Sequence, residues 1–93
     1  MDADKQWRID TGSLLKGATL RKAKWKAPGD DWEHDHCFCC WAEFAAREAD
    51  GVLHEGYTTT ARHGHRAGYH WVCETCFVDL KSEMQWQLEP SAG

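Results

Sequence analysis

The sequence predicts a small α+β fold: a treble-clef-like zinc-binding domain with a short N-terminal strand region, a β-hairpin and a C-terminal helix. Two C-x-x-C pairs, a strand-like stretch before the second pair and an amphipathic stretch after it support this prediction. A chain of 93 residues buries only about two-thirds of its unfolded surface, so we expect an additional stabilising cross-link, for which the cysteines are the candidates. We divide the chain into a flexible N-terminal segment, residues 1–13, and a single zinc-binding domain, residues 14–90.

The first predicted element is a strand region over residues 14–27. Its apolar residues alternate on even positions and then on odd ones: Ala18 and Leu20, followed by Ala23, Trp25 and Ala27. This change of parity predicts a bulge or a break near residues 21–22. A turn signal at residues 28–31, Pro-Gly-Asp-Asp, ends the region.

Three further elements follow. The spacing of Trp41, Phe44 and Ala45 predicts a short helix over residues 41–49. Aromatic and β-branched residues at 57–60 and 69–72 flank a Gly-containing tip and predict a hairpin. The last element is an amphipathic helix from Cys76 that Pro90 stops, and its apolar positions are Phe77, Leu80, Met84 and Leu88.

The cysteine spacing predicts a metal site. Two thiolates from each C-x-x-C turn complete a tetrahedron around one zinc ion, and this site leaves no open position, so the metal is structural. The ligands are Cys37, Cys40, Cys73 and Cys76. The second pair precedes the predicted helix, whose positive N-terminal dipole favours ionised thiols.

Alternatives to this ligand set remain open at the level of sequence. The pairs could form disulfides, or the thiols could be unliganded and buried. Cys39 lies inside the first pair and is interpreted as a small buried hydrophobe or a spare thiol. His36 is adjacent to Cys37 and could replace one ligand.

Charge is distributed unevenly along the chain. Residues 1–29 carry seven Lys or Arg and three Asp, a balance of +4, whereas residues 30–93 carry four Lys or Arg and twelve Asp or Glu, a balance of −8. The whole chain therefore lacks the charge of a nonspecific nucleic-acid binder, although its basic arm could meet an acidic surface. The candidate interaction residues are Lys22, Lys24 and Lys26 on the strand and Arg62 and Arg66 in the hairpin tip. Ordinary solvated surface is the alternative interpretation of both groups.

Three catalytic interpretations fit poorly. A thioredoxin-like redox motif at residues 73–76 would need more chain after it and leaves the first cysteine pair unexplained. A zinc deaminase would need His-x-Glu and Pro-Cys-x-x-Cys, neither of which occurs. An HNH-like nuclease could use His63 and His65, but they lack a convincing general-base neighbourhood.

Two blocks of the chain resemble a group of small, uncharacterised bacterial proteins. The group shares a D-H-x-H-C-x-x-C-W-A-x-F block, which residues 33–44 resemble with Glu33 at the first position, and a W-x-C-x-x-C-F block, which residues 71–77 match. The likeness covers roughly residues 14–88. It implies a treble-clef-like zinc domain and no activity, and this chain departs from the pattern by placing Cys39 inside the first pair.

These observations lead to an expected function. We expect a non-enzymatic, zinc-stabilised protein-interaction module of the adaptor, inhibitor or immunity type. The alternative is a small nucleic-acid-binding zinc finger that uses the basic N-terminal strand. The first residues have neither the basic nor the apolar region of a secretory signal, and no apolar run suits a bilayer, so a cytoplasmic protein without a membrane partner is expected. No small-molecule substrate is inferred.

Overall fold

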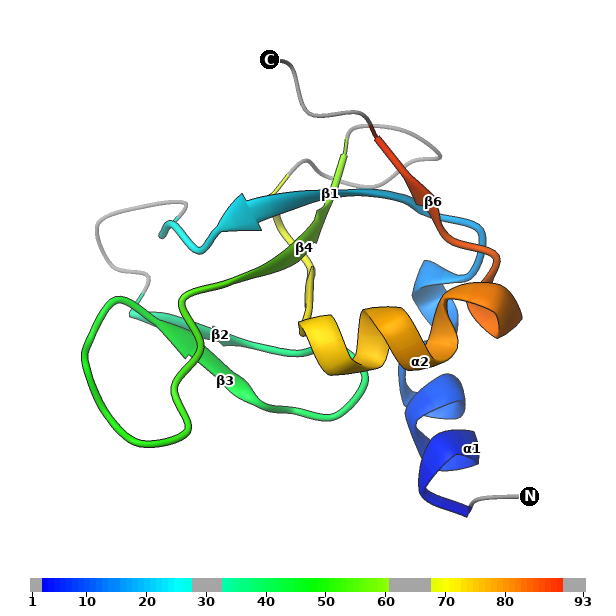
Figure 1. Cartoon of the computed structure of the whole chain (residues 1–93), viewed down its shortest axis with the longest axis horizontal. Coiled ribbons are helices and arrows are strands. Elements are labelled where there is room, and N and C mark those ends of the chain that lie inside the picture. The colour runs from blue at the N-terminus through cyan, green and yellow to red at the C-terminus, as the bar shows by residue number, and fades with distance from the viewer. Residues whose placement is uncertain (1–2, 28–32, 61–67, 90–93) are drawn as a thin grey trace.

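The computed structural model describes residues 3–27, 33–60 and 68–89 (Figure 1). Helices and strands follow one another along the chain as α1 (Ala3–Thr11), η1 (Ser13–Leu15), β1 (Thr19–Lys24), β2 (His34–His36), β3 (Glu43–Ala45), β4 (Glu55–Thr59), β5 (Trp71–Val72), α2 (Glu74–Met84) and β6 (Gln87–Leu88). This arrangement is a small α+β fold, as the sequence predicts.

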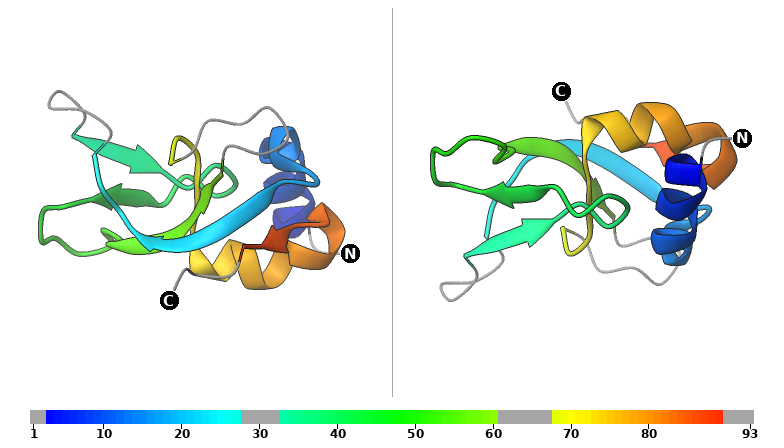
Figure 2. Two further views of the ribbon diagram at one scale, coloured as in Figure 1. Left: turned by 90° about the horizontal axis from the view of Figure 1, so that it is seen from above. Right: turned by 90° about the horizontal axis from the view of Figure 1, so that it is seen from below.

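A four-stranded sheet of order β5-β4-β1-β6 forms the centre of the fold. Neighbouring residues of β4 point to opposite faces of this sheet. On one face Tyr57 stacks on Phe77 of α2, with ring centroids 3.8 Å apart. On the other face Gly56 meets the Phe44 ring of β3, so the two-stranded β2–β3 sheet covers that side. Figure 2 shows α2 and the β2–β3 pair on different sides of β1 and β4.

The predicted hairpin and C-terminal helix are confirmed in their main parts. β4 and β5 pair antiparallel, with Tyr57 opposite Val72. Helix α2 buries Phe77, Leu80 and Met84 as its apolar spacing predicts. Its predicted extension to Leu88 is wrong, because Gln85 takes a left-handed conformation with φ of 55° and β6 then pairs parallel with β1. The predicted hairpin tip, with Arg62 and Arg66, and the predicted turn at 28–31 lie outside the described residues.

The predicted helix over residues 41–49 is wrong. Trp41 has a φ of 68°, which is incompatible with a right-handed helix, and the chain continues into β3. There Phe44 pairs with Asp35 of β2 in an antiparallel register. Phe44 and Ala45 are both buried. The apolar spacing that suggests a helix therefore reflects one strand that packs on the larger sheet.

The predicted break in the first strand region is also absent. β1 runs without interruption and pairs with β4 from Leu20 to Lys24. Its apolar residues change from even to odd positions because a different face of the strand is buried at each end. Leu20 is fully buried in the core, whereas Ala23 faces the β2–β3 side, opposite Gly56. Beyond the strand, Trp25 donates its indole N–H to Asp35 of β2 at 2.9 Å.

Helix α1 is an element that the sequence did not predict, since residues 1–13 were expected to be a flexible segment. Its residues are mostly polar, and within this fully described helix the only buried residue is Arg8. It packs against α2, where Lys5 forms an ion pair with Glu83 at 2.5 Å. Trp7 and Ile9 are the only large apolar residues of this helix, so the sequence lacks the repeated apolar stripe that predicts a buried helix face.

Candidate metal centre

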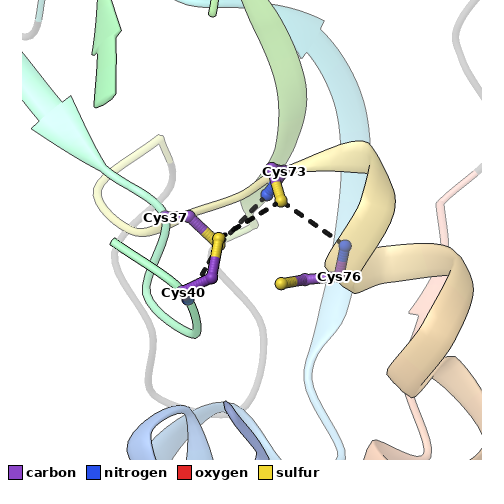
Figure 3. Close-up of side chains that lie close together, drawn as sticks. All are labelled: Cys37, Cys40, Cys73 and Cys76. Carbon is purple, nitrogen blue, oxygen red and sulfur yellow. Dashed lines mark hydrogen bonds between the residues drawn. The ribbon is translucent and has the colours of Figure 1, made fainter. Parts of the chain in front are cut away.

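Four cysteine sulfurs converge at one point of the fold. The Sγ atoms of Cys37, Cys40, Cys73 and Cys76 all lie within 4.8 Å of one another (Figure 3). A tetrahedral ion with ligand bonds of ~2.3 Å would hold its sulfurs ~3.8 Å apart. The Sγ atoms of Cys40 and Cys73 are 3.7 Å apart, in agreement with this spacing. The four residues are therefore positioned to hold one metal ion.

The first cysteine pair is held in place by the edge of the central sheet. Phe38 donates its amide to the carbonyl of Trp71 at 2.7 Å, which fixes the turn against β5. Within the turn, the amide of Trp41 donates to the carbonyl of Cys37 at 2.9 Å, and the amide of Cys37 donates to the carbonyl of Ala42 at 2.7 Å. Strand β5 leads directly into Cys73, so one strand positions both pairs.

The second pair begins helix α2. Cys73 is the N-cap residue, with extended backbone angles, and its Sγ accepts a hydrogen bond from the amide of Cys76 at 3.4 Å. A sulfur in an N-cap position satisfies an amide that has no partner within the helix. The positive end of the helix dipole also favours negative charge on these sulfurs.

The surroundings of Cys37 favour its thiolate. Its Sγ accepts backbone N–H groups of Cys39, Cys40 and Cys73 at 3.4, 3.5 and 3.3 Å. Hydrogen bonds from the thiols of Cys39, then of Cys73 and Cys76, hold the pKa of Cys37 well below its ordinary value, against the opposing effect of burial. The same contact with Cys37 raises the pKa of Cys73 and of Cys76. Without an ion the cluster therefore favours one thiolate, at Cys37, which the neighbouring thiols stabilise by hydrogen bonds.

Cys39 and His36 are the two alternative ligands that the sequence left open. Cys39 is fully buried, and its thiol is outside the group of four sulfurs. A Cβ atom added at Gly12 would lie 2.4 Å from Cys39 Sγ, so this thiol packs closely beneath the N-terminal segment. The hydrogen bond to Cys37 raises the pKa of Cys39 to about 12. Among the described residues no histidine joins the group, and His36 is exposed.

Of the predicted interaction residues, Lys22 and Lys24 line one pocket together with Cys40 and Cys73 of the metal centre. Lys22 forms an exposed ion pair with Glu74 at 3.8 Å, whereas Lys24 and Lys26 are exposed. The structure adds one residue that the sequence did not indicate, which is Arg8. Its Nη1 atom donates to Cys76 Sγ at 3.5 Å and to Asp79 Oδ2 at 3.2 Å. Nothing in the linear spacing could have identified this contact, because it joins residues at opposite ends of the chain.

No helix within the described part of the chain has the length and apolar character needed to cross a membrane. Comparison with protein-family models, with curated proteins and with solved structures gives no match. Function therefore has to be inferred from the chain's own geometry and chemistry.

Proposed function

We propose that this protein is a non-enzymatic interaction module whose fold is stabilised by zinc at the four clustered cysteines. Four thiolates suit a tetrahedral zinc ion and fill its coordination shell, so neither water nor a substrate can bind the metal. The order of a cysteine turn, the β4–β5 hairpin and α2 supports a treble-clef-like arrangement. The metal then supplies stability, and function belongs to the surface of the domain.

Trp41 is the observation that favours a protein partner. It has a φ of 68°, a conformation that costs a residue with a side chain roughly 1–2 kcal/mol and that glycine adopts freely. Its side chain nevertheless remains 58% exposed, so packing in the core does not explain its presence. Strain at an exposed aromatic residue is typical of functional positions, and tryptophan is enriched among residues that dominate binding energy.

Other aromatic groups surround this tryptophan. The His36 ring lies 5.7 Å from the Trp41 ring, and the His70 ring lies 4.6 Å from the Phe38 ring. Trp41, His34, His36, Phe38, Tyr69 and His70 all line one cleft of about 220 Å³. We call these six residues the Trp41 face and propose that it contacts the partner.

Replacement of Trp41 by glycine is expected to separate binding from stability. Trp41→Gly should raise the free energy of unfolding by up to about 1 kcal/mol, because the left-handed strain disappears. It should also abolish capture of a partner that the unmodified chain retains. Val78→Ala is the matched control, since Val78 is 69% exposed on α2 and outside the Trp41 face. Chemical denaturation and affinity capture measure the two effects. Equal capture by both variants would exclude the Trp41 face as the interface.

A separate observation supports nucleic-acid binding as a second candidate. Arg21, Lys24 and Lys26 line one cavity of about 340 Å³, and no acidic residue is among its described lining residues. Within the described part of the chain these three cations form no ion pair. Exposed cations that form no ion pair are available to contact phosphate groups.

A salt titration with single-stranded RNA tests this second candidate. Three phosphate contacts predict a slope of about −2 for the logarithm of affinity against the logarithm of salt concentration. Replacement of Arg21, Lys24 and Lys26 by glutamine should then remove binding. The control replaces Lys16 and Lys81, which are exposed elsewhere on the molecule. Absence of binding at low salt would leave the protein-interaction proposal as the only one.

A further inference from the structure

Arg8 is a buried cation on a helix that is otherwise mostly exposed. Its side chain is 10% exposed, whereas its partners Asp4 and Asp79 are 67% and 45% exposed. Its Nε atom lies 3.1 Å from Asp4 Oδ2 but forms no hydrogen bond. A buried guanidinium is expensive unless its charge is compensated, and two half-solvated carboxylates compensate it only in part.

The sulfur of Cys76 provides the remaining compensation. Four thiolates around a divalent ion carry a net charge of −2, and the Nη1 atom of Arg8 lies 3.5 Å from one of those sulfurs. A neutral thiol is a weak hydrogen-bond acceptor, whereas charge-assisted hydrogen bonds are about twice as strong as neutral ones. The contact therefore has its full strength when the cysteines hold a metal.

We propose that Arg8 is an outer-sphere residue of the metal centre, and that its contact with Cys76 holds α1 as a cover over the bound ion. This inference rests on the proposed zinc site. Arg8 acts on the metal through Cys76, so it is a positioning residue. Arg8 recognises the negative charge that the cysteine thiolates retain when they hold the metal ion.

Apart from the contacts of Arg8 with Cys76 and with Asp79 of α2, little keeps α1 in place. Lys5 and Glu83 form a partly exposed ion pair, and such pairs contribute little to stability. The apolar packing of α1 against the rest of the domain comes from half-buried residues such as Ile9. An isolated helix of 9 residues is not stable in water, so α1 released from the centre would also lose its helical hydrogen bonds. Helicity at the N-terminus thus reports on the contacts of Arg8, and zinc affinity reports on its contact with Cys76.

The experiment compares zinc-loaded wild type, Arg8→Met and Arg8→Lys by hydrogen exchange and by competition with a chelator. Arg8→Met retains a long apolar side chain but has no charge. We expect exchange of the α1 amides to rise by at least ~10-fold, while the α2 amides stay protected. Zinc affinity should fall ~10–100-fold, the usual effect of losing an outer-sphere partner. Arg8→Lys keeps the positive charge but lacks the planar guanidinium group. Its α1 exchange and its zinc affinity should therefore lie between those of wild type and Arg8→Met.

Lys5→Met is the matched control, because it removes a cation of α1 that does not contact the cysteines. It should leave zinc affinity unchanged. Unchanged α1 exchange and unchanged zinc affinity in Arg8→Met would overturn the inference while leaving the zinc proposal intact. A wild-type chain that binds no zinc would instead refute the proposed function itself. Protection of α2 in each variant identifies any protein that has failed to fold.

Discussion

Removal of the metal is expected to unfold the protein. Zinc binding by four cysteines contributes an apparent ~10–16 kcal/mol at neutral pH, which equals or exceeds the total stability of ~5–15 kcal/mol that a small domain has. The four sulfurs lie where the first cysteine turn, β5 and α2 meet, so the elements of the fold lose their common attachment when the ion is removed. Metal analysis should give one zinc per chain. Chelation should abolish the cooperative unfolding transition seen by circular dichroism, and added zinc should restore it.

Two cysteines of the same turn provide a matched pair of variants. Cys37→Ala removes a ligand whose sulfur accepts three backbone N–H groups, and it should abolish both metal binding and folding. Cys39→Ala removes a buried thiol outside the group of four, and it should keep one zinc per chain with a small loss of stability. Loss of metal in Cys39→Ala, or a folded Cys37→Ala without metal, would contradict this ligand assignment.

The metal centre could be predicted from sequence because its geometry is local. A C-x-x-C turn brings two sulfurs together whatever surrounds it, and a single ion joins two such turns. The β4–β5 hairpin could be predicted for a similar reason, since β-branched and aromatic residues on both arms indicate two adjacent strands. Neither prediction required knowledge of distant contacts.

The errors occur where tertiary contacts decide the local conformation. Trp41 and Phe44 have helical spacing, but the left-handed backbone at Trp41 and the packing of Phe44 on the sheet produce a strand. The predicted end of the last helix is wrong because pairing of β6 with β1 replaces helical hydrogen bonds beyond Met84. Arg8 could not be identified at all, because its partner Cys76 approaches it only in the folded chain.

Replacement of Phe44 by alanine is expected to cause the largest loss of stability that leaves the metal ligands untouched. Phe44 is fully buried, and its ring lies 5.5 Å from the Trp71 ring. Gly56 also lies against the ring, since a Cβ added there would be 2.8 Å from it, so no side chain at that position can fill the space left behind. Phe→Ala substitutions in cores cost about 3–5 kcal/mol, and the higher values belong to sites that cannot collapse.

Urea denaturation at a fixed free zinc concentration measures this loss, because zinc binding itself contributes to the apparent stability. Phe44→Leu is the control: it retains most of the apolar volume and should lose clearly less than Phe44→Ala. Both variants should still bind one zinc, since Phe44 belongs to β3 and supplies no ligand. A Phe44→Ala protein within about 1 kcal/mol of wild type would show that the β2–β3 pair contributes little to the fold. The stability would then come mainly from the metal centre and from the side chains packed between the sheet and α2, such as Tyr57 and Phe77.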